Sequence, residues 1–342
     1  MLKRLYLHHF RSYEKKEFTF QEGINVIRGE NACGKTNLLE AVYLLSTGRS
    51  FRTIQLTDLI RHGEPFFYLE ADFASGPISQ HLKVSFDGQV KRVEHDGATY
   101  SQFTPLLGLF PTVLHVPEDI ELITGSPTQR RRFLDLHIAQ IDPLYIFHLA
   151  RYFKAMRQRN VLLRQKKETA IESWEQILLI SGQYLHQKRK EILLALQPHL
   201  IEAMARLSDG ADILGAEYQP SLTDDYKKSR LKELQMGATL IGPHRDDFHL
   251  TIGGQDASGF ASQGQQRCAA AALRLAQWRH FSTLLDSPPL VGIDDFGVHL
   301  DTKRSRALLH EIEPMGQVFV TCPHDVKMLG ATLPLHELEV IS

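Results

Sequence analysis

The pattern of apolar and polar residues changes character twice along the chain. Up to about residue 125, apolar side chains recur in short runs, such as residues 68–73 and 82–86, in which they alternate with polar ones. This alternation predicts half-buried β-strands. From about residue 128 to 236 glycine nearly vanishes, and Leu, Arg, Lys and Gln recur over long stretches that favour helices. Mixed α/β character returns from about residue 237.

This order of patterns predicts an α/β head that is interrupted by a helical insertion. We assign residues 1–127 to the first part of the head, 128–236 to a helical lobe, and 237–342 to the second part of the head. The insertion has only about a hundred residues, too few for a long coiled-coil arm, so we expect a compact lobe.

A phosphate-binding pattern stands between a predicted strand, residues 24–27, and a predicted helix, residues 38–45. The eight residues from Gly29 to Thr36 read as glycine, four residues, then Gly-Lys-Thr. Glycines at this spacing let consecutive backbone amides turn inward around phosphate groups, and the N-terminus of the following helix favours an anion. The sequence therefore predicts a nucleoside triphosphate site.

Each side chain of this loop has an expected role. Lys35 can reach the β and γ phosphates of ATP, and the hydroxyl of Thr36 can coordinate Mg²⁺. The residues expected to contact ATP are Gly29, Glu30, Asn31, Ala32, Cys33, Gly34, Lys35, Thr36 and Asn37.

Two adjacent carboxylates follow a second predicted strand, residues 288–293. If this strand lies beside the strand that leads into the loop, Asp294 comes next to the Mg²⁺ ion held by Thr36. Asp295 then stands where a carboxylate could orient and deprotonate the attacking water, so we assign it as the catalytic base. The alternative is a buried strand that ends in an ordinary acidic turn.

A second helix N-terminus lies about 25 residues earlier. The alanine- and leucine-rich residues 268–276 form a strong helix pattern, and a polar segment with a serine at its start precedes them. One nucleotide rarely needs two helix N-termini from one chain. We therefore expect this segment to contact a nucleotide that is bound by another copy of the protein, through Ser262, Gln263, Gly264 and Gln265.

Composition limits the remaining possibilities. The chain has 342 residues, 43% of them hydrophobic, without an apolar run long enough to cross a membrane or to serve as a signal peptide. Its three cysteines are far apart, which suggests neither disulfides nor a metal site and favours a reducing, cytoplasmic compartment. The formal net charge is −1, so any DNA-binding surface must come from local charge separation.

The basic residues gather in the predicted helical lobe. Residues 151–167 contain no acidic side chain, and Lys188-Arg189-Lys190 forms a second basic cluster. The first cluster predicts contacts with DNA phosphates, although a solvated helix face is an equally good explanation. Its members are Arg151, Lys154, Arg157, Arg159, Arg164, Lys166 and Lys167.

Residues 262–267 resemble the signature motif of ABC-type ATPases, in the variant found in the RecF family of bacterial DNA repair proteins. The order of phosphate loop, signature, Asp-Asp strand and Leu300-Asp301 is similar too. The segment most specific to this family is Gly242-Pro243-His244-Arg245-Asp246-Asp247. Further similar segments are residues 48–53, 125–127, 130–135 and 158–160.

Three positions depart from the family pattern. Ala32 replaces a glycine that many ABC-type loops carry, and His299 stands where glutamate is usual. His324 could serve as a γ-phosphate sensor or be an ordinary surface histidine.

The resemblance implies an ABC-type ATPase head, similar to the heads of SMC and Rad50 proteins, with ATP and Mg²⁺ as cofactors. It implies an ATP-dependent homodimer that binds single-stranded, gapped and double-stranded DNA. It further implies work with RecO and RecR in loading RecA during recombinational gap repair, replication restart and the SOS response. Its ATPase would be a weak, DNA-stimulated switch.

Two other classes of protein share parts of this pattern. The ATPase subunit of a membrane transporter has the same three motifs, but it usually carries glutamate at the position of Asp295 and lacks residues 242–247. A metabolic kinase has no use for residues 262–267.

Overall fold

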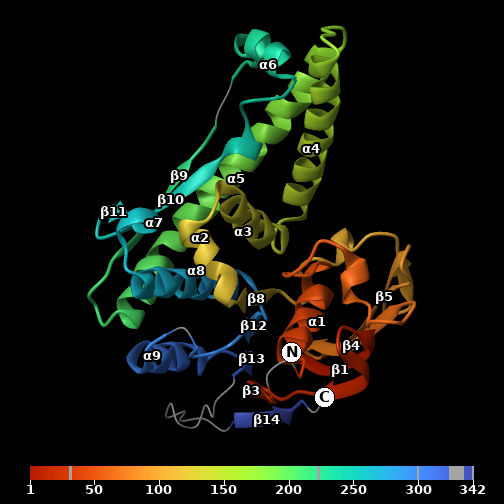
Figure 1. Ribbon diagram of the computed structural model, residues 1–342, viewed down its shortest axis with the longest axis vertical. Coiled ribbons are helices and arrows are strands. Elements are labelled where there is room, and N and C mark those ends of the chain that lie inside the picture. The colour runs from red at the N-terminus through yellow and green to blue at the C-terminus, as the bar shows by residue number, and fades with distance from the viewer. Residues whose placement is uncertain (31–32, 222–223, 299, 323–334, 341–342) are drawn as a thin grey trace.

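The computed structural model describes residues 1–30, 33–221, 224–298, 300–322 and 335–340 (Figure 1). The described residues form a head, which contains two large sheets, and an arm of two long helices that projects from it. The first and last strands of the described chain both belong to the head, so the middle of the chain builds the arm. This is the interrupted α/β head that the sequence predicts.

One sheet of the head is antiparallel and has the strand order β2-β1-β4-β5-β6-β7. The predicted strands at residues 68–73 and 82–86 are confirmed as parts of β4 and β5. The bounds are β1 (Leu2–Phe10), β2 (Tyr13–Thr19), β4 (Phe67–Ser75), β5 (Ile78–Phe86), β6 (Lys91–His95) and β7 (Ala98–Tyr100).

The second sheet is parallel and has the order β14-β3-β13-β12-β8. Its inner strands are buried on both faces, which explains why they read as short continuous apolar runs rather than as alternating patterns. The bounds are β3 (Gly23–Arg28), β8 (Thr112–His115), β12 (Leu290–Ile293), β13 (Gln317–Thr321) and β14 (Leu335–Glu339).

Helices cover both faces of the parallel sheet. The α-helices are α1 (Lys35–Thr47), α2 (Glu121–Thr124), α3 (Pro127–Ala139), α4 (Pro143–Arg164), α5 (Ile171–Leu207), α6 (Arg230–Met236), α7 (Ala257–Phe260), α8 (Gln263–Leu284) and α9 (Thr302–Ile312). Short 3-10 helices lie at Leu56–Leu59, Thr104–Leu106, Pro117–Ile120, Tyr226–Lys228 and Pro243–Arg245.

Helix α1 is packed between the two sheets of the head. Ten of its thirteen residues are buried, and its leucines share one apolar cluster with the antiparallel sheet and with Phe319 of β13. The neighbouring Val318 and Val320 point to the opposite face of the parallel sheet, into the cluster that α8 and α9 complete. Because side chains alternate along each strand, one face of this sheet packs against α1 and the other face packs against α8 and α9.

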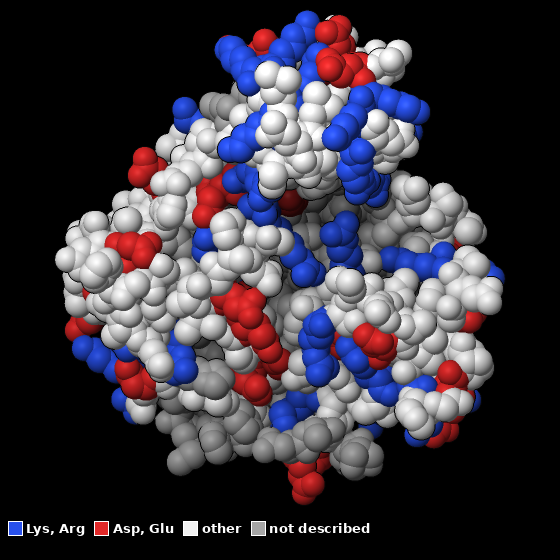
Figure 2. Space-filling view, turned by 45° about the horizontal axis from the view of Figure 1, so that its top comes forward, with Lys and Arg blue, Asp and Glu red and all other residues white. Residues whose placement is uncertain are grey.

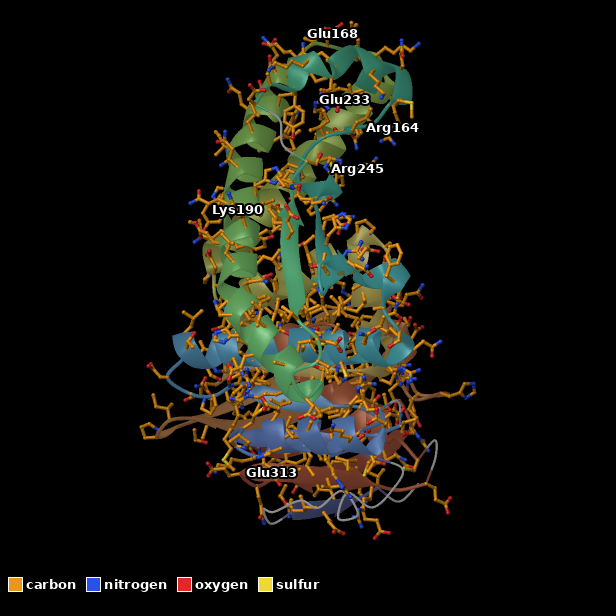
Figure 3. The ribbon with its side chains drawn as sticks, turned by 90° about the vertical axis from the view of Figure 1, so that its left-hand side faces the viewer. Arg164, Glu168, Lys190, Glu233, Arg245 and Glu313 are labelled. Carbon is orange, nitrogen blue, oxygen red and sulfur yellow. The ribbon has the colours of Figure 1, made fainter. Side chains whose placement is uncertain are left out.

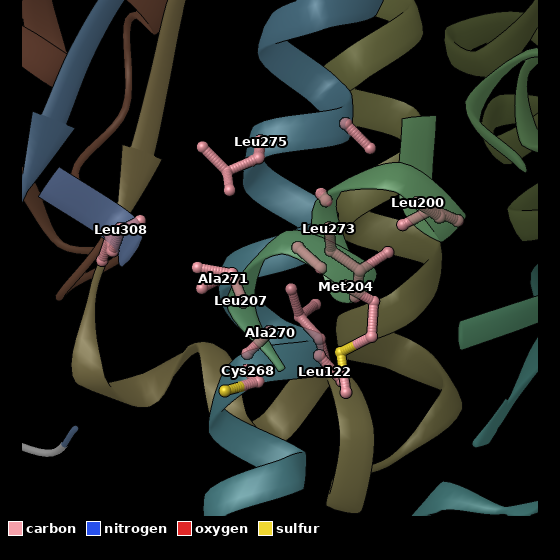
Figure 4. Packing of buried hydrophobic residues seen from close by; sticks show 14 of the residues in the cluster. Leu122, Leu200, Met204, Leu207, Cys268, Ala270, Ala271, Leu273, Leu275 and Leu308 are labelled. Carbon is pink, nitrogen blue, oxygen red and sulfur yellow. The ribbon is translucent and has the colours of Figure 1, made fainter. Parts of the chain in front are cut away.

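The alanines of α8 let this helix approach α5 closely (Figure 4). Residues 269–272 are all alanine and are buried, and they pack with Leu200, Met204 and Leu207 of α5. Small side chains at such a crossing shorten the distance between the helix axes. The long helix of the arm is thereby anchored in the core of the head.

The arm is an antiparallel pair of helices, α4 and α5, with α6 at its tip (Figures 1 and 3). Helix α5 has 37 residues, which corresponds to a length of about 55 Å at 1.5 Å per residue. The insertion is not entirely helical, because residues 214–219 form strand β9. This strand pairs with β10 (Asp247–Ile252), and β11 (Gln255–Asp256) completes a third small sheet.

One of the basic residues assigned to DNA contact is instead buried in the arm, so that assignment is wrong for Arg159. Its side chain is 0% exposed and donates to Glu175 at 2.9 Å and to Glu233 at 2.6 Å. The guanidinium also donates to the hydroxyl of Thr239. A buried charge is stable only when it is paired, so this cluster ties α4, α5 and α6 together.

Arg189, from the second basic cluster of the sequence, is buried as well. Its guanidinium bonds to Asp135 of α3 and to Asp246, both at 2.8 Å, and to the carbonyl of Pro243. Arg130 of α3 pairs with Asp247 in the same way. The segment from residue 242 to 247 is therefore the joint that fixes the arm to α3.

Loss of Glu233 should destabilise the arm severely. The variant Glu233→Ala leaves Arg159 short of one buried partner and removes the acceptor of the Leu240 amide. We expect the free energy of unfolding to fall by about 3–5 kcal/mol, as measured by urea denaturation. The matched control, Glu172→Ala, removes an exposed partner of Lys227 and should leave the denaturation midpoint nearly unchanged, because exposed ion pairs contribute little to stability. Equal effects of the two variants would contradict the structural role of the buried cluster.

Candidate nucleotide-binding site

The phosphate loop connects β3 to α1, as the sequence predicts. Gly34 ends the loop with φ of 113°, and a Cβ atom at this position would lie 2.6 Å from the hydroxyl oxygen of Ser12. Glycine is required here for both reasons. The hydroxyl of Tyr13 donates to the carbonyl of Gly34 at 3.0 Å, so β2 supports the loop from behind.

The side chains of the loop are held in place by local hydrogen bonds. The ammonium group of Lys35 donates to the carbonyls of Gly29 and Glu30, each at 2.8 Å, which places its charge over the loop. The amide of Asn37 donates to Ser12 and accepts from Arg52. Two further expected ATP contacts, Asn31 and Ala32, lie outside the described residues.

Thr36 and Asp294 are hydrogen-bonded, although the strands that precede them, β3 and β12, are not neighbours in the sheet. Strand β12 does not lie beside β3, contrary to the expectation from the sequence, because β13 lies between them. The hydroxyl of Thr36 nevertheless donates to Asp294 at 3.0 Å. Thr321, the last residue of β13, fills the gap, since its hydroxyl donates to Asp294 at 2.6 Å and accepts from the amide of Asp295 at 2.8 Å.

The oxygens of Thr36 and Asp294 fit a divalent cation such as Mg²⁺. Burial raises the pKa of Asp294, and the adjacent Asp295 carboxylate raises it further, against the hydrogen bonds from Thr321 and Thr36. A cation at this position would relieve the electrostatic cost of the buried carboxylate. Carboxylate and hydroxyl oxygens are also the kind of ligands that Mg²⁺ prefers.

Asp295 has an unusual backbone conformation, with φ of 50°. Its side chain and that of Asp294 line a cavity of about 40 Å³, together with His115 and Arg267. Such a cavity is large enough to hold water. The geometry is therefore compatible with the assignment of Asp295 as a base.

The predicted second helix N-terminus is confirmed as the start of α8. Ser262 caps the helix by accepting from the amide of Gln265, whose side chain in turn accepts from the amide of Ser262. The side chain of Gln265 also donates to Asp212 at 2.8 Å. Ser262 and Gln263 are exposed, so their polar groups are available to a ligand.

Gly264 makes room for an arginine. A Cβ atom at this position would lie 2.3 Å from a guanidinium nitrogen of Arg304, which belongs to the first turn of α9. A larger residue than glycine would push Arg304 away. The start of α8 thus combines a helix N-terminus with a nearby guanidinium group.

The start of α8 and the phosphate loop are not brought together within the chain. In Figure 1, α7 and α8 lie to the left of α1, with the strands of the parallel sheet between them. Among the described residues, the side-chain hydrogen bonds of Ser262 and Gln265 go to each other and to Asp212. One chain therefore presents the phosphate loop and the predicted second anion site at separate places.

The other six basic residues that the sequence assigns to DNA contact are accessible. Arg151 is half-buried, and the others are exposed. None of them forms a salt bridge to a carboxylate within the part of the chain that the structure describes. These residues are Arg151, Lys154, Arg157, Arg164, Lys166 and Lys167.

Several residues that support the site were not identified from the sequence. Thr321 and Arg304 lie far from the loop in sequence, and nothing in their local pattern indicates the contacts that they make. The polar pair Ser12 and Tyr13 marks the turn between β1 and β2, which does not reveal that it supports the loop. His299 and His324 lie outside the described residues.

Comparison with known proteins places the chain in a family. A family model described as RecF/RecN/SMC N terminal domain matches residues 1–103. The chain is 42% identical to the DNA replication and repair protein RecF of Protochlamydia amoebophila, over 94% of this chain and 93% of that protein. It is 34% identical to the protein of the same name from Geobacillus thermodenitrificans, over 94% and 92% of the two chains.

Solved structures agree with this assignment. A structure described as the recombination mediator protein RecF-ATP in the RecFOR pathway superposes with a TM-score of 0.87 at 31% identity, and covers 95% of this chain and 92% of that chain. An SMC head bound to a domain of ScpA shares the fold, with a TM-score of 0.56 at 15% identity. Among the described helices, none is both long and apolar enough to cross a membrane. The chain belongs to the RecF family of DNA replication and repair proteins, which have an ABC-type ATPase fold.

Proposed function

We propose that the protein is an ATP-dependent DNA clamp in which two copies enclose two ATP molecules. Each ATP is bound by the phosphate loop of one copy and by the start of α8 of the other. The observation that carries this proposal is the separation of the phosphate loop and the start of α8 within one head. In a dimer with a two-fold axis, the start of α8 of each copy can contact the nucleotide in the phosphate loop of the other copy.

Within one copy, the phosphate loop supplies most of the ATP contacts. Lys35 binds the β and γ phosphates, and Thr36 and Asp294 hold Mg²⁺, which neutralises phosphate charge when it is bound. Asp295 orients and deprotonates the attacking water. Hydrolysis then acts as a slow switch, because the dimer depends on the γ-phosphate that both copies contact.

Family membership supports a proposal for the biological role. The relatives bear the name DNA replication and repair protein, and one solved relative is described as part of the RecFOR pathway. We propose that this protein binds gapped DNA in the cytoplasm, interacts with RecR, and assists RecO and RecR in loading RecA during gap repair, replication restart and the SOS response. An ATPase subunit of a membrane transporter would not need the joint formed by residues 242–247, which holds an arm.

The face of the arm that carries residues 151–167 is the proposed contact with the DNA backbone. Its six accessible cations lie along α4 and at the tip, where Figure 3 shows Arg164. Such a surface would not distinguish DNA sequences, because the phosphates are the same along any DNA.

Lys35→Ala should weaken ATP binding and abolish ATP-dependent dimerisation. The variant removes the ammonium group aimed at the terminal phosphates, while the loop backbone keeps its glycines. ATP affinity can be measured by filter binding and the dimer by light scattering. The control Lys303→Ala removes an exposed lysine on α9 and should leave ATP affinity unchanged. Wild-type ATP affinity of Lys35→Ala would refute the nucleotide site.

Asp295→Asn should leave ATP binding intact and slow hydrolysis by about 100-fold or more, because an amide cannot accept the proton of the attacking water. Asparagine tolerates the positive φ of this position, so the change tests the carboxylate rather than the backbone. The ATP-bound dimer should then accumulate, as seen by light scattering. Hydrolysis at the normal rate would show that Asp295 is not the base. The exposed Asp286→Asn is the control.

Ser262→Arg should block dimerisation but leave ATP binding by the monomer nearly normal. The arginine brings bulk and positive charge against Lys35 of the other copy, whereas the phosphate loop of its own chain is intact. Mixing this variant with Lys35→Ala should restore partial dimer formation and ATPase activity, because one composite site of the mixed dimer keeps both elements. If the Ser262→Arg protein dimerises with ATP as the wild type does, Ser262 only caps α8 and does not contact the nucleotide of the other copy.

A further inference from the structure

A cleft of about 660 Å³ lies between the head and the arm. The end of the phosphate-loop helix contributes Gly48 and Arg49, strand β6 contributes Lys91, and α3 and α4 close the other sides. Figure 2 shows lysine and arginine side chains gathered in the hollow between the arm and the head. Its volume falls within the roughly 300–1,000 Å³ typical of ligand sites.

The cleft has an excess of positive charge. Four of its lining residues are cations, and in the described part of the chain no carboxylate forms a salt bridge with any of them. Its acidic lining residue, Asp135, is already paired with Arg189. The four cations are Arg49, Lys91, Arg131 and Arg132.

Three of these cations are oriented by backbone carbonyls rather than by acids. Lys91 donates to Gly48 at 2.7 Å, Arg131 to Asp246 at 2.7 Å, and Arg132 to Ser50 at 3.4 Å. These bonds fix the side chains without an ion pair to any of them. Burial and, to a smaller degree, Arg49 lower the pKa of Lys91 to about 8. An anion in the cleft would relieve this repulsion.

The other walls of the cleft are apolar. Phe153 of α4 is 36% exposed, and Leu136, Ile146 and Leu149 line the same side. Phe103 lies beneath Lys91, with the ammonium 5.1 Å from the ring centre. Phosphate contacts alone would leave these surfaces exposed to water, so the cleft suits a ligand that carries an apolar group beside its negative charge.

We propose that this cleft holds one or a few nucleotides of a single DNA strand. The phosphates contact Arg49, Lys91, Arg131 and Arg132, and an unpaired base packs against Phe153 and the adjacent apolar wall. Duplex DNA keeps its bases paired and stacked, so it presents their edges and its backbone but no free base face, whereas proteins bind single strands through cationic grooves combined with aromatic platforms. This inference rests on the proposed DNA function and adds a site where a gap or an overhang would be distinguished from intact duplex.

The test uses the full-length protein and two labelled DNAs, a blunt duplex and the same duplex with a single-stranded extension. The double variant Arg49→Glu/Phe153→Ala removes one phosphate contact and the stacking surface, and neither residue has a described salt bridge. Anisotropy should show at least a tenfold loss of affinity for the extended duplex and about a twofold change or less for the blunt one.

A matched control changes the outer face of α5. Lys190→Glu/Leu194→Ala replaces an exposed lysine and an exposed leucine, neither of which lines the cleft. It should bind both DNAs as the wild type does. Unchanged circular dichroism and ATP affinity of both double variants exclude misfolding as the cause.

Other results would overturn the proposal. Wild-type binding of both DNAs by the cleft variant, or an equal loss for both, would show that the cleft does not select a single strand. Displacement of the extension by an equimolar deoxynucleoside monophosphate would identify a site for free nucleotides instead. A wild-type protein that binds neither DNA would refute the proposed function itself.

Discussion

The hydrogen bond from Thr36 to Asp294 is the contact on which the ATPase head depends, because it joins two parts of the chain that are 258 residues apart. The phosphate loop comes from the first part of the head and the acidic strand from the second. Strand β13 lies between their strands, and Thr321 at its end bonds to Asp294 and to the backbone of Asp295. The order of strands therefore determines whether a metal site can form.

This constraint explains how the arm is attached. The chain must leave the first part of the head and return to the second without separating β3 from β13. Arg189 bonds to Asp135 on the outgoing chain and to Asp246 on the returning chain, and Arg130 pairs with Asp247 beside them. Buried ion pairs have strict geometric requirements, so they define one orientation of the arm. The arm is therefore part of the head's architecture as well as the proposed surface for DNA.

The sequence predicts the loop and the α8 cap well, because each is a local pattern whose chemistry depends on neighbouring residues. It fails where the environment comes from distant segments. Arg159 and Arg164 lie on the same helix with the same charge, yet only Arg159 meets Glu175 and Glu233, from α5 and α6. Strand β9 was missed for a related reason, since its partner β10 lies beyond the helical stretch that surrounds it in sequence.

Helix α1 connects the two sites that we propose, one for ATP and one for a DNA strand. It begins at Lys35 in the phosphate loop and ends at Thr47, and Lys91 donates to the carbonyl of the next residue, Gly48, which lines the cleft. Because α1 is buried between two sheets, neither end can shift without repacking its neighbours. Binding energies are coupled reciprocally. If a DNA strand in the cleft favours the arrangement of α1 in the ATP-bound dimer, ATP must strengthen the binding of that strand by the same factor.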